Sequence, residues 1–192
     1  MISKFDYFPS EVYREENKQF IESGIRAIDR SNEALCQEGL LLQTPELGQE
    51  NELKSLVEHL TKQSTSILND QGYRVDLYNY RPFLWGQKLL KGAGHLAHVH
   101  ANSQVSALYF LRTPENGAFP VFEDPRNGKK MGEIIQNHSE EVKSSTPEIH
   151  FNNVIPGTIL YFNSWLPHKI MQNRSEEPTY FLHFILKANE AY

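Results

Sequence analysis

The spacing of apolar residues divides the chain into two parts. Up to about residue 72, apolar side chains recur every three or four positions among charged ones, which is the period of an amphipathic helix. A short strand over 3–9 is expected before Ser10, which is a candidate N-cap for a first helix that runs to about Gln37. A second helix is expected over 53–72, with an apolar stripe that should pack against a sheet.

From residue 73 onward the period changes to the alternation of β-strands. Residues 40–50 are expected to connect the helices as a loop, and the polar stretch 131–146 to be a solvated excursion or a mobile loop near a site. Strands separated by Pro, Gly and Asn turn signals are expected at 73–85, 95–101, 104–112, 119–124, 147–154, 158–163, 168–173 and 179–187.

Two helices followed by many short strands indicate an α+β fold whose core is a double-sheet sandwich or barrel. The length of 192 residues fits one domain, 1–192, because no repeat or linker divides it. Within this domain, we expect a helical N-terminal part over about 10–72 and a β core over about 73–187. The two helices should pack on one sheet from outside.

Composition excludes some classes of partner. Lys and Arg number 19 against 24 Asp and Glu, and this net charge of −5 lacks the basic excess of a nucleic-acid-binding protein. The single Cys36 cannot form a disulfide within the chain, and the N-terminus has no signal-peptide pattern. No apolar stretch is long enough to span a bilayer. We therefore expect a cytoplasmic protein with no membrane or nucleic-acid partner.

Candidate chemistry is concentrated in residues 94–103, where His95, His98 and His100 fall within six positions. In an extended backbone, side chains two positions apart point to the same face. His98 and His100 should therefore present two imidazoles side by side, and imidazole is the commonest protein ligand of transition metals. His95 is better placed to orient a ligand than to bind the metal.

A third ligand is expected from residues 156–168, where a Pro-Gly turn starts an apolar strand and His168 opens the next one. If both strands belong to the same barrel as residues 95–111, His168 can lie opposite His98 and His100. Three protein ligands hold a metal while leaving positions open for O2 and a cosubstrate. A lone His-x-His pair would be a weak signal, whereas a pair with a distal histidine is a specific one.

These residues are also the ones that carry a resemblance to a known family. The chain resembles a family of 2-oxoglutarate- and Fe(II)-dependent oxygenases over roughly residues 70–187. The likeness rests on a His-x-His segment, an Asn-Ser, a Ser-x-x-Tyr strand, an Asp-Pro-Arg and a Phe-x-Ser-Trp-Leu-x-His segment, which here are His98-Val99-His100, Asn102-Ser103, Ser106 to Tyr109, Asp124-Pro125-Arg126 and Phe162 to His168.

The resemblance implies a double-stranded β-helix (jelly-roll, cupin-like) fold, one Fe(II), and 2-oxoglutarate as cosubstrate. It places His98 at the first histidine of the metal site, His100 where the family's relatives have a carboxylate, and His168 at the distal histidine. These three residues are accordingly the expected metal ligands and catalytic residues. A site in which His98 and His168 hold the iron and His100 only neighbours it stays open at this point.

The chain departs from the wider superfamily at the cosubstrate anchor. An Arg usually follows the distal histidine by about ten residues, but here Thr179 and His183 are expected on the inward face of that strand and no Arg is present. Tyr109 and Arg81 are candidate substitutes, because a phenol or a guanidinium can bind a carboxylate. The expected cosubstrate-binding residues are thus Tyr109, Arg81, Thr179 and His183.

The sequence therefore predicts a non-haem Fe(II)- and 2-oxoglutarate-dependent oxygenase that uses O2, acting on a small molecule or a side chain, most often by hydroxylation. Two alternatives stay open at this point. One is a three-histidine, cupin-like iron dioxygenase that does not use 2-oxoglutarate, favoured by His100 and the missing Arg. The other is a non-catalytic jelly roll that binds a metal or a ligand.

Overall fold

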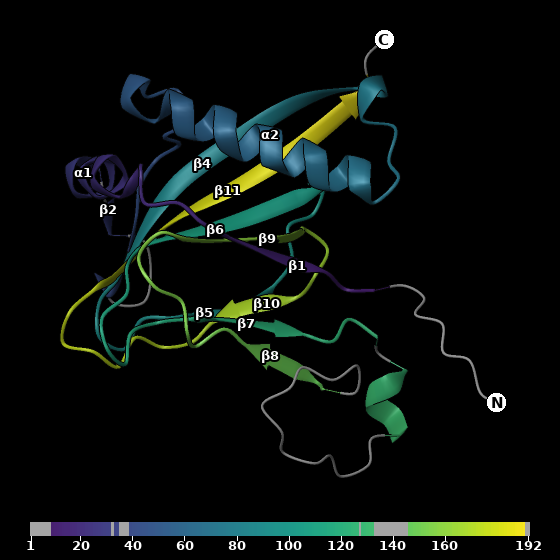
Figure 1. The fold of residues 1–192 in the computed structure, drawn as a ribbon. Helices are drawn as coiled ribbons and strands as arrows, with labels where there is room; N and C mark the ends of the chain where they lie inside the picture. Colours follow the sequence, from purple (N-terminus) through teal and green to yellow (C-terminus); the bar gives the residue numbers. More distant parts are fainter. Residues whose placement is uncertain (1–8, 32, 35–38, 127, 133–145, 191–192) are drawn as a thin grey trace.

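The computed structural model describes residues 9–31, 33–34, 39–126, 128–132 and 146–190 (Figure 1). Two antiparallel sheets face each other, and two helices cover the outer face of the larger sheet. The fold has three layers, with helices, larger sheet and smaller sheet in that order. The predicted α+β fold, with a jelly-roll core and helices packed on one sheet, is confirmed.

Seven strands form the larger sheet in the order β1-β9-β6-β11-β4-β3-β2. Every pair in this sheet is antiparallel. The strands are β1 Val12–Glu16, β2 Glu33–Ala34, β3 Leu41–Gln43, β4 Tyr78–Leu89, β6 Val105–Arg112, β9 Thr158–Asn163 and β11 Thr179–Glu190.

Four strands form the smaller sheet in the order β5-β10-β7-β8, namely β5 His95–His98, β7 Pro120–Glu123, β8 Glu148–His150 and β10 His168–Ile170. The helices are α1 Ile21–Ser31 and α2 Lys54–Asp70, with short 3-10 turns at Asn51–Leu53, Val75–Leu77 and Lys129–Gly132. No helix among the described residues is long and apolar enough to cross a membrane.

Strands β4 and β11 form the longest ladder, pairing without a register shift from Leu89↔Thr179 to Tyr78↔Glu190. Side chains alternate between the faces of a strand, so the ladder separates two cores. Leu182 and Phe184 pack under the helices, whereas Phe181 packs between the sheets. His183, like Phe181, is therefore on the face that looks toward the smaller sheet.

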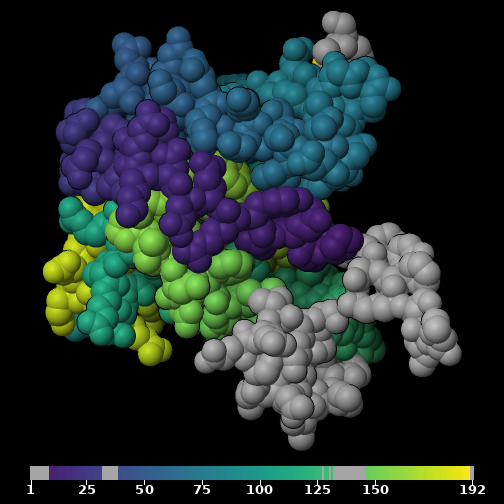
Figure 2. Space-filling view, in the orientation of Figure 1, coloured from purple at the N-terminus to yellow at the C-terminus, as the bar shows by residue number. Residues whose placement is uncertain are grey.

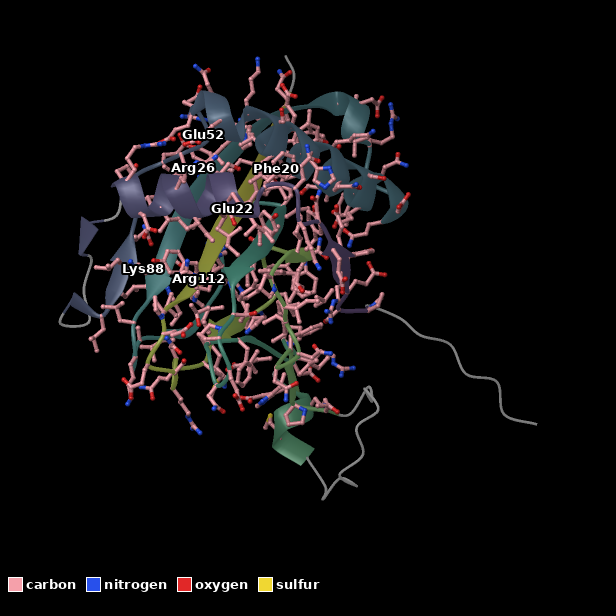
Figure 3. All side chains as sticks on the ribbon, turned by 60° about the vertical axis from the view of Figure 1, so that its left-hand side comes forward. Phe20, Glu22, Arg26, Glu52, Lys88 and Arg112 are labelled. Atoms are coloured by element: carbon pink, nitrogen blue, oxygen red, sulfur yellow. The ribbon has the colours of Figure 1, made fainter. Side chains whose placement is uncertain are left out.

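The apolar stripe of α2 is buried as its sequence predicts, through Leu56, Val57, Leu60, Ile67 and Leu68. Helix α1 instead approaches the sheet closely through small residues. A Cβ added to Gly86 of β4 would collide with the side chain of Ile28 on α1. The outer edge of α1 is held by the ion pair of Arg26 with Glu52, at 3.7 Å (Figure 3).

The N-terminal part differs from its prediction in three places. The first helix ends at Ser31 rather than near Gln37, and residues 33–34 form β2, which pairs with β3. Residues 12–16 form β1, which pairs with β9 along the surface, and the first helix begins at Ile21 and not at Ser10 (Figure 2). Apolar residues keep a helical spacing through residues 12–16, but pairing with the open edge of β9 decides the conformation there. Residues 41–43 of the expected loop form β3, which pairs with β4. The expected strand over 3–9 and most of the stretch 131–146 lie outside the described residues.

Substitution of Gly86 by Ala should destabilise the fold by about 1–3 kcal/mol, because the added methyl group overpacks the contact between α1 and β4. Urea unfolding followed by circular dichroism measures this change. Gly128→Ala is the control, since nothing lies within 4 Å of an added Cβ there. Equal stability of the two variants would show that α1 does not depend on this close approach.

Candidate metal centre

His98 and His168 are direct partners across the antiparallel strands β5 and β10. Cross-strand partners on one face bring their Cβ atoms to about 4.5–5.5 Å, so backbone pairing alone brings the two imidazoles together. Their ring centroids are 4.4 Å apart. The register of this pair shifts between His168 and Ile170, which is a bulge of the kind that often lies beside active sites.

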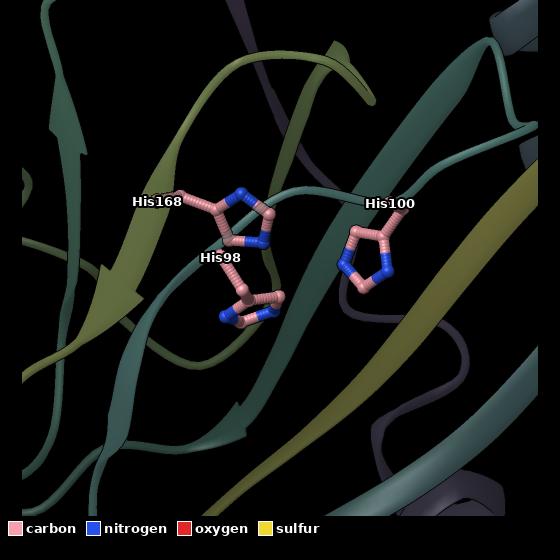
Figure 4. A group of neighbouring side chains, drawn as sticks. All are labelled: His98, His100 and His168. Atoms are coloured by element: carbon pink, nitrogen blue, oxygen red, sulfur yellow. The ribbon is translucent and has the colours of Figure 1, made fainter.

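His100 reaches the same place from a loop, because β5 ends at His98. Its backbone N–H donates to the carbonyl oxygen of Ser164 at 2.9 Å, which ties this loop to the segment that precedes β10. The His100 ring lies 5.0 Å from His98 and 5.2 Å from His168, centroid to centroid (Figure 4). The structure thus brings together all three expected ligands, and one ring nitrogen of each lies within 4.8 Å of the others.

Backbone carbonyls fix the tautomer of two of these rings. Nδ1 of His98 donates to the carbonyl oxygen of Leu96 at 2.8 Å, and Nδ1 of His168 donates to that of Leu166 at 2.9 Å. A carbonyl oxygen only accepts, so the hydrogen is on Nδ1 and the lone pair is on Nε2. This second hydrogen bond is the one that metal-binding histidines typically make.

Burial keeps the rings of His168 and His100 neutral. His168 is fully buried, and this burial, with the neighbouring histidines, lowers its pKa to about 3. Burial likewise lowers the pKa of His100 to about 4. Nε2 of each of these two rings is buried and has no hydrogen-bond partner among the described residues. A neutral imidazole with an unpartnered Nε2 is the form that binds a transition metal, so the donor set fits an iron ion.

Aromatic side chains pack against His168, His100 and His183. Phe162 meets the His168 ring edge-on at 4.6 Å, and Phe122 lies 6.2 Å from it. Trp85 of β4 lies 4.5 Å from His183 and 6.3 Å from His100, centroid to centroid. These rings exclude water from the inner side of the cluster.

His183 is the expected cosubstrate residue that the structure places beside the cluster. Its ring lies 4.6 Å from His100 and 6.2 Å from His168, and its Nε2 is buried without a partner among the described residues. Burial lowers its pKa well below the ordinary value, so this ring is also neutral.

The other expected cosubstrate residues lie elsewhere. Tyr109 faces the helices, where its hydroxyl donates to the carbonyl oxygen of Asn17 at 2.7 Å, so its expected role is corrected. β6 alternates, and Leu108 rather than Tyr109 faces the space between the sheets. Thr179 is buried, accepts from the Ala118 N–H at 2.9 Å, and is separated from His183 along β11 by Phe181.

Arg81 is on the inward-looking side of β4 but is exposed and four residues from Trp85, about 13 Å along the strand. No Lys or Arg is among the buried residues of the described chain. The space between the sheets therefore offers the neutral donors of histidines and hydroxyls to a carboxylate, and no buried cation.

His95 lies to one side of the cluster, as predicted, with its ring 5.8 Å from that of His98. It lines a separate cavity of about 1110 Å³ bounded by the loops 113–119 and 152–156, to which none of the three expected ligands contributes. His95 is the only histidine among its described lining residues, so this cavity lacks the three convergent imidazoles of the cluster.

Two features of the site were not anticipated from the sequence. The carbonyls of Leu96 and Leu166 orient the ligands, and each lies two residues before its histidine. Every residue has a main-chain carbonyl, so residue type does not reveal these hydrogen bonds. Only the equal spacing of two residues before each histidine could have suggested them. The contact of Trp85 with His183 depends on their being Cα partners in the ladder, which requires the register of β4 and β11.

Comparison with known proteins identifies the family of this chain. Residues 83–184, more than half of the chain, match the sequence profile of the family described as "Putative 2OG-Fe(II) oxygenase". The matched segment contains His98, His100, His168 and His183. No curated protein sequence matches the chain.

Solved structures share the fold at low sequence identity. The chain is similar to a Pseudomonas putida prolyl-4-hydroxylase, with a TM-score of 0.62, 13% identity, and coverage of 93% of this chain and 92% of that one. HygX from Streptomyces hygroscopicus, solved with nickel and 2-oxoglutarate bound, gives a TM-score of 0.62 at 15% identity, covering 93% and 83%. A 2OG-Fe(II) oxygenase family oxidoreductase from Burkholderia pseudomallei gives 0.58 at 13% identity, covering 87% and 77%.

The structural likenesses establish the fold, and the family profile establishes the class of enzyme. The family's cofactors, Fe(II) and 2-oxoglutarate, agree with a cluster of three histidines whose ring nitrogens converge within 4.8 Å. The chain belongs to the family of 2-oxoglutarate- and Fe(II)-dependent oxygenases.

Proposed function

We propose that His98, His100 and His168 hold the Fe(II) of this oxygenase through three ring nitrogens. The observation that carries this proposal is the convergence of those nitrogens within 4.8 Å of one another. The hydrogen bonds from Nδ1 of His98 and His168 to backbone carbonyls support Nε2 as the ligand atom on both. His100 takes the position of a carboxylate, so the ligand set carries one negative charge fewer than the usual two-histidine, one-carboxylate site.

Fe(II) with 2-oxoglutarate and O2 supplies the oxidation of a substrate C–H bond to an alcohol, with succinate and CO2 as the other products. The chain's own residues orient and enclose this chemistry. The carbonyls of Leu96 and Leu166 hold two rings in fixed orientations, and Phe162 and Phe122 keep water from the inner side of His168. We infer that the substrate is a small molecule.

We also propose that His183 contacts the cosubstrate. Its neutral ring can donate one hydrogen bond from Nε2, and this nitrogen has no partner among the described residues. Unpartnered buried donors are costly, about 1–3 kcal/mol each, so an acceptor at this position would stabilise the protein. A carboxylate oxygen of 2-oxoglutarate is such an acceptor.

We propose that one domain carries this function. Helices α1 and α2 contact β4, β6 and β11, which are the strands that support Trp85 and His183. Strand β1 completes the edge of the same sheet beside β9. The N-terminal part therefore supports the sheet that carries the site.

Substitution of His168 by Ala should abolish stoichiometric binding of Fe(II). Anaerobic reconstitution followed by metal analysis measures the iron content, and wild-type protein should retain one ion per chain. Metal at a hundredfold excess over its dissociation constant stabilises the folded state by about 2.7 kcal/mol, so thermal unfolding of the wild type should also shift upward and that of the variant should not.

His150→Ala is the matched control, because His150 is an exposed histidine of the same sheet that contacts Glu148. It should bind iron as the wild type does. Retention of full iron content by His168→Ala would contradict the proposed ligand set.

Substitution of His183 by Ala should weaken the binding of 2-oxoglutarate by roughly three- to tenfold, the value of one hydrogen bond of about 0.5–1.5 kcal/mol. Isothermal titration of the nickel-loaded wild type and variant with 2-oxoglutarate, under nitrogen, gives the affinity of each protein for 2-oxoglutarate without turnover. His59→Ala, on the outer helix α2, should bind as the wild type does. Unchanged affinity in His183→Ala would remove His183 from the cosubstrate site.

The free energy of unfolding of the metal-free protein should fall as the pH drops from about 6.5. His168 has a pKa of about 3 in the folded state because it is buried, whereas in the unfolded chain it is ordinary at about 6.5. Between these values only the unfolded chain binds the proton, so acid favours unfolding, by at most about 1.4 kcal/mol per pH unit for this residue. Urea unfolding between pH 7.5 and 5 in the presence of a chelator measures the slope, which His168→Gln should reduce. An equal slope in the variant would contradict this origin.

A further inference from the structure

The ladder of β4 and β11 continues beyond the histidine cluster toward the end of the sheet. Trp85 pairs with His183, Phe83 pairs with Ile185, and Arg81 pairs with Lys187. Because the ladder has no register shift, these alternate residues share one face. The face that holds Trp85 against His183 and His100 therefore also carries Phe83, Arg81 and Lys187.

Two cations converge on the ring of Phe83. The guanidinium carbon of Arg81 lies 4.7 Å from its centroid and the ammonium nitrogen of Lys187 lies 5.0 Å from it. Arg81 and Lys187 are also direct cross-strand partners, an arrangement that destabilises a sheet when the charges are alike. Neither takes part in any ion pair found among the described residues.

The opposite face of the same sheet contains a comparable group that is neutralised. Lys88 and Arg112 lie over the ring of Tyr180 at 5.0 and 4.7 Å, and Figure 3 shows both cations on the sheet below α1. There Asp29 of α1 accepts from Lys88 at 3.2 Å and from the Tyr180 hydroxyl at 2.9 Å. The group around Phe83 likewise has one Arg and one Lys over an aromatic ring. The described residues place no carboxylate against this Arg or this Lys.

We propose that an anionic group of the substrate, a carboxylate or a phosphate, binds between Arg81 and Lys187. The proposal rests on the proposed function and names the class of substrate for the same site. A guanidinium binds such groups through paired hydrogen bonds, and an ammonium adds a point charge. Phe83 and Trp85 support the apolar part of the molecule, which extends roughly 7–13 Å along the sheet toward the histidines.

The position of these cations separates them from the cosubstrate. Arg81 and Lys187 are each four residues along their strands from Trp85 and His183. The side chains of Arg81 and Lys187 reach the ring of Phe83. Phe83 is the inward-facing residue of β4 that precedes Trp85. The anionic group of the substrate and 2-oxoglutarate therefore bind together, and saturation with 2-oxoglutarate leaves the outer site available.

Titration of nickel-loaded protein under nitrogen, with saturating 2-oxoglutarate, tests the proposal. The probes are 4-phenylbutyrate and phenyl phosphate, with neutral 4-phenylbutyramide as the reference. At least one anion should bind ten times more tightly than the amide, and which one does so distinguishes a carboxylate from a phosphate site. The double variant Arg81→Gln, Lys187→Gln should lose this preference and unfold at the same temperature as the wild type or higher, because the like-charge pair is removed.

The double variant Lys88→Gln, Arg112→Gln is the matched control, since it removes the same two charges from the other face. It should keep the preference for the anion. The proposal is overturned if neither anion binds better than the amide, if the Arg81 and Lys187 variant keeps the preference, or if 2-oxoglutarate abolishes it. Nickel content, measured on every sample and on His168→Ala, reports separately whether the proposed metal ligands are wrong.

Discussion

The pairing of His98 with His168 across β5 and β10 is the constraint on which the site depends. It sets two imidazoles side by side, 4.4 Å apart between centroids and tilted by 54°, and backbone carbonyls two residues earlier hold each ring with Nε2 free. His100 then needs only one loop contact, its N–H to the Ser164 carbonyl, to complete the cluster. Main-chain geometry thus provides the preorganisation that a metal site requires.

The same principle extends over the larger sheet. The uninterrupted ladder of β4 and β11 places His183 and Trp85 beside the cluster, and Phe83, Arg81 and Lys187 beyond it. Burial makes His168 and His183 neutral, while the two cations, Arg81 and Lys187, stay at the exposed end of the ladder. Along β4 and β11, the inward face of the sheet therefore changes from neutral histidine nitrogens to aromatic rings and then to two positive charges. This order fits an elongated substrate with an anionic group at one end.

Sequence reasoning found the strands after residue 73, the second helix and the three metal-ligand candidates, because alternation and histidine spacing are local signals. It placed the first helix too early, since the edge pairing of β1 with β9 is not local. Tyr109 was assigned to the wrong face of its strand. Alternation divides the side chains of a strand between two faces, but it does not show which face is turned toward the smaller sheet. The partners of Arg81 and Trp85 required the register of two strands about 100 residues apart in the chain, which no single segment encodes.

The central claim is that three histidine nitrogens hold the iron, and a crystal structure of the anaerobic, Fe(II)-loaded protein tests it most directly. We expect one ion bound by His98, His100 and His168, through Nε2 of His98 and His168. An ion held by His95 or His183 in place of any of the three, or bound through Nδ1 of His168, would contradict it.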